Sequence, residues 1–199
     1  FFGFTGAAVV VDWAYFQGQH ALGWVNYLFV WSAVHQLGYA WSDGKLAERW
    51  KTVPMFVVGL ALLLGLTRFG PYPRAMVGVP GDAISNTTPP KITLIALALA
   101  QGGLLLSLQE PLRRWLARAA PWTATVLVNG MIMTIYLWHL TAMVLWIGLA
   151  FALGGLGMGR EPGSAGWWSA RPLWPATLAV VLFPLVMIFS RFERPKTSA

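Results

Sequence analysis

Cysteine is absent from this chain of 199 residues, and charged residues make up only 11% of it. The lack of cysteine excludes disulfide bonds, thiolate metal ligands and a cysteine nucleophile. The scarcity of charge, together with a hydrophobic fraction of 57% and a mean hydropathy of +0.59, excludes a soluble domain and a disordered tail. Three scattered histidines lack the ligand spacing of a zinc site, so we expect no bound metal and no resident cofactor.

Acidic residues are also few, 7 against 14 Lys and Arg, which gives a net charge of +7. The basic residues do not gather on one stripe, as a nucleic-acid-binding face requires, but lie in short clusters between apolar runs. Lys and Arg in such positions set the orientation of a membrane protein. The charge therefore favours a lipid bilayer as partner and excludes nucleic acid.

Five long apolar runs separate the charged clusters. They are residues 22–41, 53–67, 91–108, about 122–151, and 174–190. A helix that rises ~1.5 Å per residue crosses ~30 Å of hydrocarbon in ~20 residues, which is near the length of these runs. Residues 1–11 make about half a span, which we interpret as the end of a helix that begins earlier in a larger protein, with residues 12–21 as an outer turn. The sequence predicts one all-α domain over 1–199, a polytopic transmembrane helix bundle of five full spans and one partial N-terminal span.

The distribution of Lys and Arg among the connecting segments predicts the orientation. Segments 42–52, 109–121 and 191–199 together hold nine of them, whereas the alternate segments 68–91 and 152–173 hold five. Cytoplasmic loops of membrane proteins carry the excess of Lys and Arg. We therefore expect residues 191–199 to form a cytoplasmic basic tail and residues 68–90 to form an outer loop.

The first full span carries one polar stripe. Ser32, His35, Gln36 and Tyr39 recur at helical spacing, whereas Asn26 falls on the opposite side of the helix. An ionisable group at membrane depth is costly and by default marks a functional site. A neutral histidine hydrogen-bonded to a neighbouring helix is the structural alternative, and the sequence leaves both interpretations of His35 open.

The fourth run has a second polar face. Asn129, Tyr136 and His139 are seven and then three residues apart, which places them on one side of a continuous helix. A helix of about thirty residues overruns the bilayer, so we expect it to tilt, kink or project. His139 has the same two interpretations as His35.

Small residues mark the third run, and charges mark the segment after it. Ala96, Ala100 and Gly103 share a face of the kind that lets two helices approach closely in lipid. The following segment, 109–121, is short and amphipathic, with Arg113, Arg114 and Arg118 on its polar side. These arginines fit contacts to lipid phosphates, and they also fit the phosphates of an acyl-CoA.

The outer loop 68–90 is the most unusual stretch of the chain. It is long, contains five Pro, and carries several polar side chains: Arg74, Asp82, Ser85 and Asn86. Long loops inside compact proteins are usually functional or disordered. Its Val and Met content argues against free disorder, so we expect a structured lid or re-entrant element.

Three segments together identify a family resemblance. They are NYLFVWSAVHQLGYAWSDGKL (26–46), GPYPRAMVGVPGDAISNTTPP (70–90) and MTIYLWHLTA (133–142). In this order they resemble the C-terminal half of the acyltransferase-3 family of bacterial integral membrane acyltransferases. The resemblance implies a bundle of roughly ten transmembrane helices, with the missing N-terminal helices of the same protein as partners. The family's best-supported catalytic histidine belongs to the first span of the whole protein, and no residue here matches it.

The resemblance implies transfer of an acyl group, often acetyl, from the co-substrate acyl-CoA to a hydroxyl of a sugar, glycolipid or similar acceptor, at the bacterial plasma membrane. His139 matches the histidine of the family's YLWH element, and His35 matches that of VHQLG. The expected catalytic residues are His139, Tyr136 and His35. The expected acceptor contacts are Arg74, Asp82, Ser85, Asn86 and Asn129. The expected contacts to the CoA phosphates are Arg113, Arg114 and Arg118.

Two alternatives to an enzyme remain from the residues alone. Intramembrane histidines also line polar paths, so a transporter or a protein that moves lipids or glycans fits His35 and His139 equally well. The chain also fits a non-catalytic scaffold half that is inactive without the missing helices.

Overall fold

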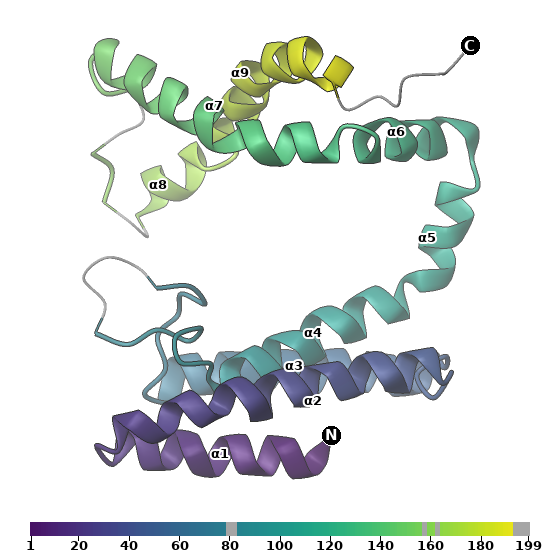
Figure 1. Ribbon diagram of the computed structural model, residues 1–199, viewed down its shortest axis with the longest axis vertical. Helices are drawn as coiled ribbons and strands as arrows, with labels where there is room; N and C mark the ends of the chain where they lie inside the picture. Colours follow the sequence, from purple (N-terminus) through teal and green to yellow (C-terminus); the bar gives the residue numbers. More distant parts are fainter. Residues whose placement is uncertain (79–82, 157–158, 162–163, 193–199) are drawn as a thin grey trace. The chain divides into compact units, whose positions relative to one another are not determined.

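The computed structural model describes residues 1–78, 83–156, 159–161 and 164–192 (Figure 1). The fold is all-helical, with 77% of the chain in helices and no strand among the described residues. The chain divides into two compact units, Phe1–Arg114 and Trp115–Ala199. The predicted all-α class is therefore confirmed.

The first unit contains the helices α1 to α4 and most of α5. Their bounds are α1 Phe2–Phe16, η1 His20–Val25, α2 Asn26–Ser42, α3 Arg49–Phe69, α4 Ile92–Ser107 and α5 Gln109–Leu116. Figure 1 shows α1 to α4 lying side by side, and α4 contacts each of the other three. The core lies where Ala8 of α1, Val30 and Ala33 of α2, and Ile95 of α4 meet.

The predicted outer turn at residues 12–21 is wrong in its first part, because α1 continues through Asp12 to Phe16. The helix can include this carboxylate because Asp12 is buried among hydrogen-bond donors from α2, the outer loop and α4. A buried charge with partners no longer opposes the helix in the way that an unpaired one does. The turn begins only at Gln17.

Glycines bring α3 and α4 into close contact. A Cβ atom added at Gly59 of α3 would lie 2.3 Å from the backbone nitrogen of Ala100, and one added at Gly103 of α4 would lie 2.3 Å from that of Phe56. Such distances mean that the two backbones touch, as small residues allow in membrane helix pairs. The predicted packing role of Ala96, Ala100 and Gly103 is confirmed, since all three are buried.

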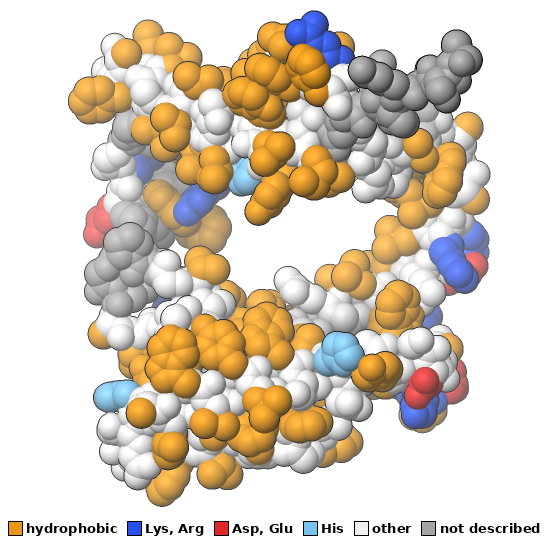
Figure 2. Space-filling model, in the orientation of Figure 1, with side chains coloured by type: hydrophobic (Ala, Val, Ile, Leu, Met, Phe, Trp, Pro, Cys, Tyr) orange, Lys and Arg blue, Asp and Glu red, His pale blue; other side chains and the backbone are white. Residues whose placement is uncertain are grey.

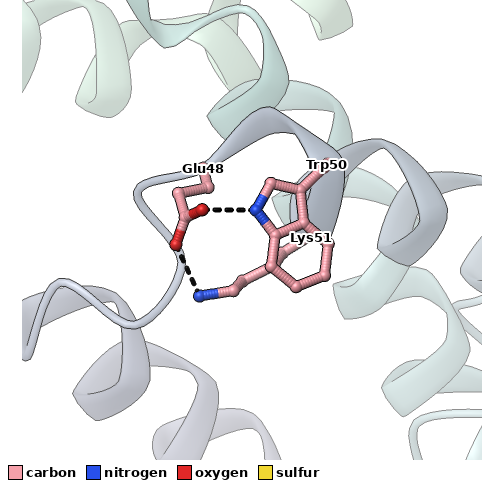
Figure 3. Close-up of polar contacts among 3 residues, drawn as sticks. All are labelled: Glu48, Trp50 and Lys51. Atoms are coloured by element: carbon pink, nitrogen blue, oxygen red, sulfur yellow. Dashed lines mark hydrogen bonds and ion pairs between the residues drawn. The ribbon is translucent and has the colours of Figure 1, made fainter.

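A polar cluster marks the start of α3 (Figure 3). The Glu48 carboxylate accepts hydrogen bonds from Lys51 Nζ at 2.7 Å and from Trp50 Nε1. These two donors lower the pKa of Glu48, with Lys51 contributing more than Trp50. A carboxylate at the N-cap is also stabilised by the positive end of the helix dipole. Glu48 therefore favours the start of α3 at Arg49.

The chain bends by 53° between α4 and α5. The bend falls at Leu108, and it separates an apolar helix from the short charged one. On α5 the Arg114 guanidinium lies 3.4 Å from the Glu110 carboxylate, and both side chains are exposed. The amphipathic segment predicted at 109–121 thus begins as a separate helix.

The second unit contains four further α-helices and a closing turn. Their bounds are α6 Ala119–Asn129, α7 Ile132–Ala152, α8 Ala165–Ala170, α9 Leu173–Phe189 and η2 Ser190–Phe192. The helices α7 and α9 pack together, with the rings of Trp138 and Phe189 stacked at 4.0 Å between centroids. Ala142 of α7 and Val186 of α9 are buried.

The fourth run, expected as one long helix that tilts, kinks or projects, is broken into two helices. The α6 helix ends at Asn129 and α7 begins at Ile132, with Gly130 and Met131 between them. Asn and Gly are poor helix formers, and the Asn129 side chain donates to the Thr125 carbonyl of its own helix at 3.0 Å. The expectation that Asn129 shares one continuous helix face with Tyr136 and His139 is therefore wrong.

Among the residues that the structure describes, three helical segments are long and apolar enough to cross a membrane. They are Arg49–Phe69, Ile132–Ala152 and Ala165–Phe192. The bent pair of α4 and α5 makes a fourth if it counts as one span. The predicted count of five full spans is not confirmed, since α2 begins only at Asn26 and has 17 residues.

Hydrophobic side chains cover much of the visible surface (Figure 2). Only 11% of the apolar window of α7 is buried, and Leu137 and Val144 each expose 65% of their surface. Apolar area of this extent is what a bilayer or neighbouring membrane helices cover. The length and the exposed apolar surface of these helices are therefore consistent with a membrane protein.

Candidate functional site

A buried carboxylate joins three parts of the first unit. Asp12 accepts hydrogen bonds from Asn26 Nδ2 of α2 at 2.8 Å, from the Tyr72 hydroxyl at 3.1 Å, and from the Ile92 backbone N–H at the start of α4 at 2.9 Å. Both carboxylate oxygens take part in these bonds. Asp12 therefore ties the outer loop to the first two helices.

Asn86 also anchors the outer loop through hydrogen bonds of its buried side chain. Its side chain is fully buried and donates to the carbonyls of Pro73 at 2.7 Å and Ala75 at 2.8 Å. Its Oδ1 atom accepts from the Thr93 hydroxyl at 2.8 Å. Both N–H groups are thus used inside the protein, and the described part of the loop is a structured element, as the sequence predicted.

Lys91 lies at the end of this loop with its whole side chain buried. Its Nζ atom lies 3.3 Å from the centroid of the Tyr15 ring, a cation–π contact, and has no hydrogen-bond partner among the described residues. Burial lowers the pKa of Lys91, and the nearby Asp12 charge opposes that shift. Burial and the same carboxylate raise the pKa of Tyr72.

The sequence analysis named neither Asp12 nor Lys91 as a site residue. The signal was present, since an Asp that continues an apolar helical run is costly at membrane depth and requires a partner. Nothing in the sequence identified Tyr72 and Ile92 as those partners, because they lie 60 and 80 residues away.

A hollow opens beside the outer loop at the C-terminal end of α3. It has a volume of about 700 Å³, its walls are mainly apolar residues of α3, and Arg68 and Arg74 line it. Both arginines are exposed. The predicted acceptor contact Arg74 therefore borders a hollow of the size that small-molecule sites have.

The remaining predicted residues of the loop lie elsewhere. The Ser85 hydroxyl accepts from the backbone N–H of Thr87 at 3.1 Å and forms part of a local turn. Asp82 lies outside the described residues, as do the predicted tail from residue 193 onward and residues 79–82 of the loop.

His35 borders a second hollow in the first unit. Three residues of the predicted polar stripe, Ser32, His35 and Gln36, line it together, and its volume is about 380 Å³. His35 is exposed and its ring meets that of Tyr39 edge-on at 4.7 Å. Asn26 is buried on the other side of α2, as the spacing predicted.

His139 and Tyr136 lie together on α7 in the second unit. The His139 Nδ1 atom is 2.5 Å from the Tyr136 backbone carbonyl, and the two rings are 5.7 Å apart. A carbonyl oxygen only accepts hydrogen bonds, so Nδ1 carries the proton and Nε2 is the basic nitrogen. Both side chains are exposed, as is Asn129.

The three arginines predicted to meet CoA phosphates are all exposed. Arg113 and Arg114 lie on α5, and Arg118 is the N-cap residue of α6. Within the described ranges, no group of three His, Asp or Glu side chains lies close enough to hold a metal ion.

Comparison of the chain with protein-family models, with curated proteins and with solved structures gave no match. The functional assignment therefore depends on the residues and their geometry.

Proposed function

We propose that this chain is the C-terminal part of a membrane-bound O-acyltransferase, which moves an acyl group, such as acetyl, from acyl-CoA to a hydroxyl of a sugar, glycolipid or similar acceptor. The observation that carries the proposal is the outer loop. The segment with the most specific resemblance to the acyltransferase-3 family, 70–90, is held by the buried side chains of Asp12 and Asn86. Such anchoring suits a loop that recognises a substrate better than it suits a simple connection.

The proposed reaction uses His139 as general base. Its Nε2 atom takes the proton of the acceptor hydroxyl while the oxygen attacks the thioester carbonyl. The new C–O bond forms, the C–S bond breaks, and the CoA sulfur leaves as a thiolate that takes up a proton. The hydrogen bond from Nδ1 to the Tyr136 carbonyl supports this role, because it fixes the tautomer in which Nε2 is free to accept.

The acceptor is proposed to bind at the hollow beside Arg68 and Arg74. Its apolar walls suit the lipid part of a glycolipid, and the guanidinium groups suit an oxygen-rich headgroup. We assign the CoA phosphates to Arg113, Arg114 and Arg118, and we place the protein in the bacterial cytoplasmic membrane with its C-terminus in the cytoplasm. His35, Asp82, Ser85 and Asn129 keep their predicted roles in this proposal.

Transport is the second candidate, and the hollow at His35 favours it. Ser32, His35 and Gln36 present polar groups together on a helix that is otherwise apolar. A polar path through a membrane protein uses such residues. The two functions differ in one observable, because an acyltransferase changes the mass of its acceptor and a transporter changes only its side.

The test uses the intact protein in proteoliposomes with radiolabelled acetyl-CoA and an extract of membrane lipids and glycans. We expect label in the extract, and we expect His139→Ala to lose about 10²–10⁴-fold in rate. The matched control is His20→Ala, which replaces an exposed histidine in η1. Tyr136→Phe tests the predicted catalytic role of the Tyr136 hydroxyl separately, since it keeps the backbone carbonyl that binds His139.

Two results would contradict the proposal. A normal rate of acyl transfer by the His139→Ala protein would show that His139 is not the general base. Movement of an unmodified acceptor across the membrane, without transfer of label, would favour transport.

A further inference from the structure

A small hollow in the second unit gathers two arginines and two tryptophans. Its volume is about 260 Å³, and it is lined by Arg160, Trp167, Ala170, Arg171 and Trp174. It lies at the N-terminal end of the apolar segment Ala165–Phe192, which is long enough to cross a membrane. Tryptophan is enriched where such segments meet the headgroup region.

Both guanidinium groups are held in place. The Arg171 Cζ atom lies 3.6 Å from the centroid of the Trp167 ring, so the guanidinium stacks on the indole. Arg160 Nη1 donates to the Gly166 carbonyl at 2.6 Å. A Cβ atom at residue 166 would lie 3.3 Å from this nitrogen, so the glycine leaves the space that the guanidinium needs.

These two positive charges have no counterion among the described residues. No carboxylate lies within ion-pair distance of either guanidinium, and neighbouring Glu161 makes no ion pair with them. Arg171 is exposed where it lines the hollow, and its side chain has no hydrogen-bond partner in the part of the chain that the structure describes. A guanidinium offers five N–H donors in a planar fork that matches the oxygens of phosphate.

We propose that this hollow binds the phosphate group of an anionic membrane lipid, with Arg160 and Arg171 as its ligands. A volume of about 260 Å³ is below the ~300–1,000 Å³ of sites for whole small molecules, and it suits a headgroup. The lipid chains would lie against the exposed apolar side chains of Trp168 and Leu173, which are next in sequence to the lining residues Trp167 and Trp174. The site is independent of the proposed acyl transfer.

The experiment is native mass spectrometry of the purified protein in detergent, titrated with phosphatidylglycerol, phosphatidylcholine or inorganic phosphate. We expect tighter retention of phosphatidylglycerol than of phosphatidylcholine. Arg160→Gln and Arg171→Gln should each weaken that retention by about tenfold, because each removes charge-assisted hydrogen bonds. Arg49→Gln is the matched control, an exposed arginine at the start of α3 and outside the hollow, and it should retain the lipid.

Two further variants separate the site from loss of folding. Arg171→Lys keeps the charge and removes the fork and the stacking, so it should weaken retention without lowering the unfolding temperature. Gly166→Ala should weaken it by displacing Arg160. Equal retention by the parent protein and the Arg160→Gln and Arg171→Gln variants would overturn the proposal. If inorganic phosphate at equal concentration displaced the lipid completely, the conclusion that the bound phosphate group belongs to a lipid would be overturned.

Discussion

The Tyr72 hydroxyl donates a hydrogen bond to the Asp12 carboxylate at 3.1 Å, across 60 residues of sequence. One partner lies in the outer loop and the other in α1, and the same carboxylate oxygen also accepts the first backbone N–H of α4. Asp12 is therefore one of the two buried side chains, with Asn86, that hold the path of the loop. Four predictions follow from this network and from the helix packing beside it.

Asp12→Ala should release the outer loop from the helices. It leaves the donors of Asn26, Tyr72 and Ile92 without their acceptor, and breaking a buried charged contact costs about 3–5 kcal/mol. We expect faster tryptic cleavage after Arg74, which is exposed in the loop. The control is Asp43→Asn, because Asp43 is an exposed acid that pairs only with Lys45. An unchanged cleavage rate in Asp12→Ala would show that the loop is held by other contacts.

Asp12 and Lys91 should be energetically coupled. Lys91 is buried without a hydrogen-bond partner, so its charge is compensated by the Tyr15 ring and by Asp12. Asp12→Asn and Lys91→Met should each destabilise the protein. Together they should cost less than their sum by about 0.5–3 kcal/mol, as residues in one network do. Thermal unfolding of the four proteins in detergent measures this difference, and strict additivity would argue against the coupling.

Tyr72 should make the protein less stable at high pH. Its folded pKa lies above the ordinary value of 10.0, because burial and Asp12 oppose its ionisation. The Tyr72 hydroxyl ionises at a lower pH in the unfolded chain than in the folded protein. The stability that Tyr72 contributes to the fold is therefore complete below pH 10, and it is lost as the pH rises through the folded pKa. Alkaline unfolding of the parent and Tyr72→Phe proteins should show a shallower loss in the variant. Burial lowers the pKa of Lys91 and gives it a pH dependence of the opposite sign, so both proteins should carry Lys91→Met. Equal slopes would contradict the prediction.

Two adjacent glycines of α4 should respond differently to alanine. Gly103→Ala places a Cβ atom 2.3 Å from the Phe56 backbone nitrogen, and overpacking of this kind costs about 1–3 kcal/mol. Gly102→Ala meets only the end of the Met55 side chain at 3.5 Å, an ordinary contact. It should be neutral or stabilising, since alanine favours a helix by about 1 kcal/mol over glycine. Unfolding temperatures in detergent compare the two, and equal losses would refute the close approach of α3 and α4.

Local patterns predicted the all-helical class and the small-residue face correctly. Ala96, Ala100 and Gly103 share a face by spacing alone, and the same periodicity placed Asn26 opposite His35. These features depend on residues within a few turns of one helix. They are therefore accessible to inspection of the sequence.

The anchoring of the outer loop was not accessible in that way. From the sequence, Asp12 is expected in an outer turn, whereas α1 includes it, and the partners that hold it there come from distant segments. The fourth run is expected to tilt, kink or project, but that expectation does not place the break at Gly130. The apolar run continues across it, and hydropathy does not register the weak helix formers Asn129 and Gly130.

The same break has a consequence for membrane topology. At ~1.5 Å per residue, the 11 residues of α6 extend only ~16 Å, about half of a bilayer core, whereas the 21 residues of α7 suffice for the whole. Since α7 alone is long enough, the proposed topology needs one crossing from the pair, as it would from one unbroken helix. The parity of the crossings, and with it the side reached by the C-terminus, is the same for two helices as for one.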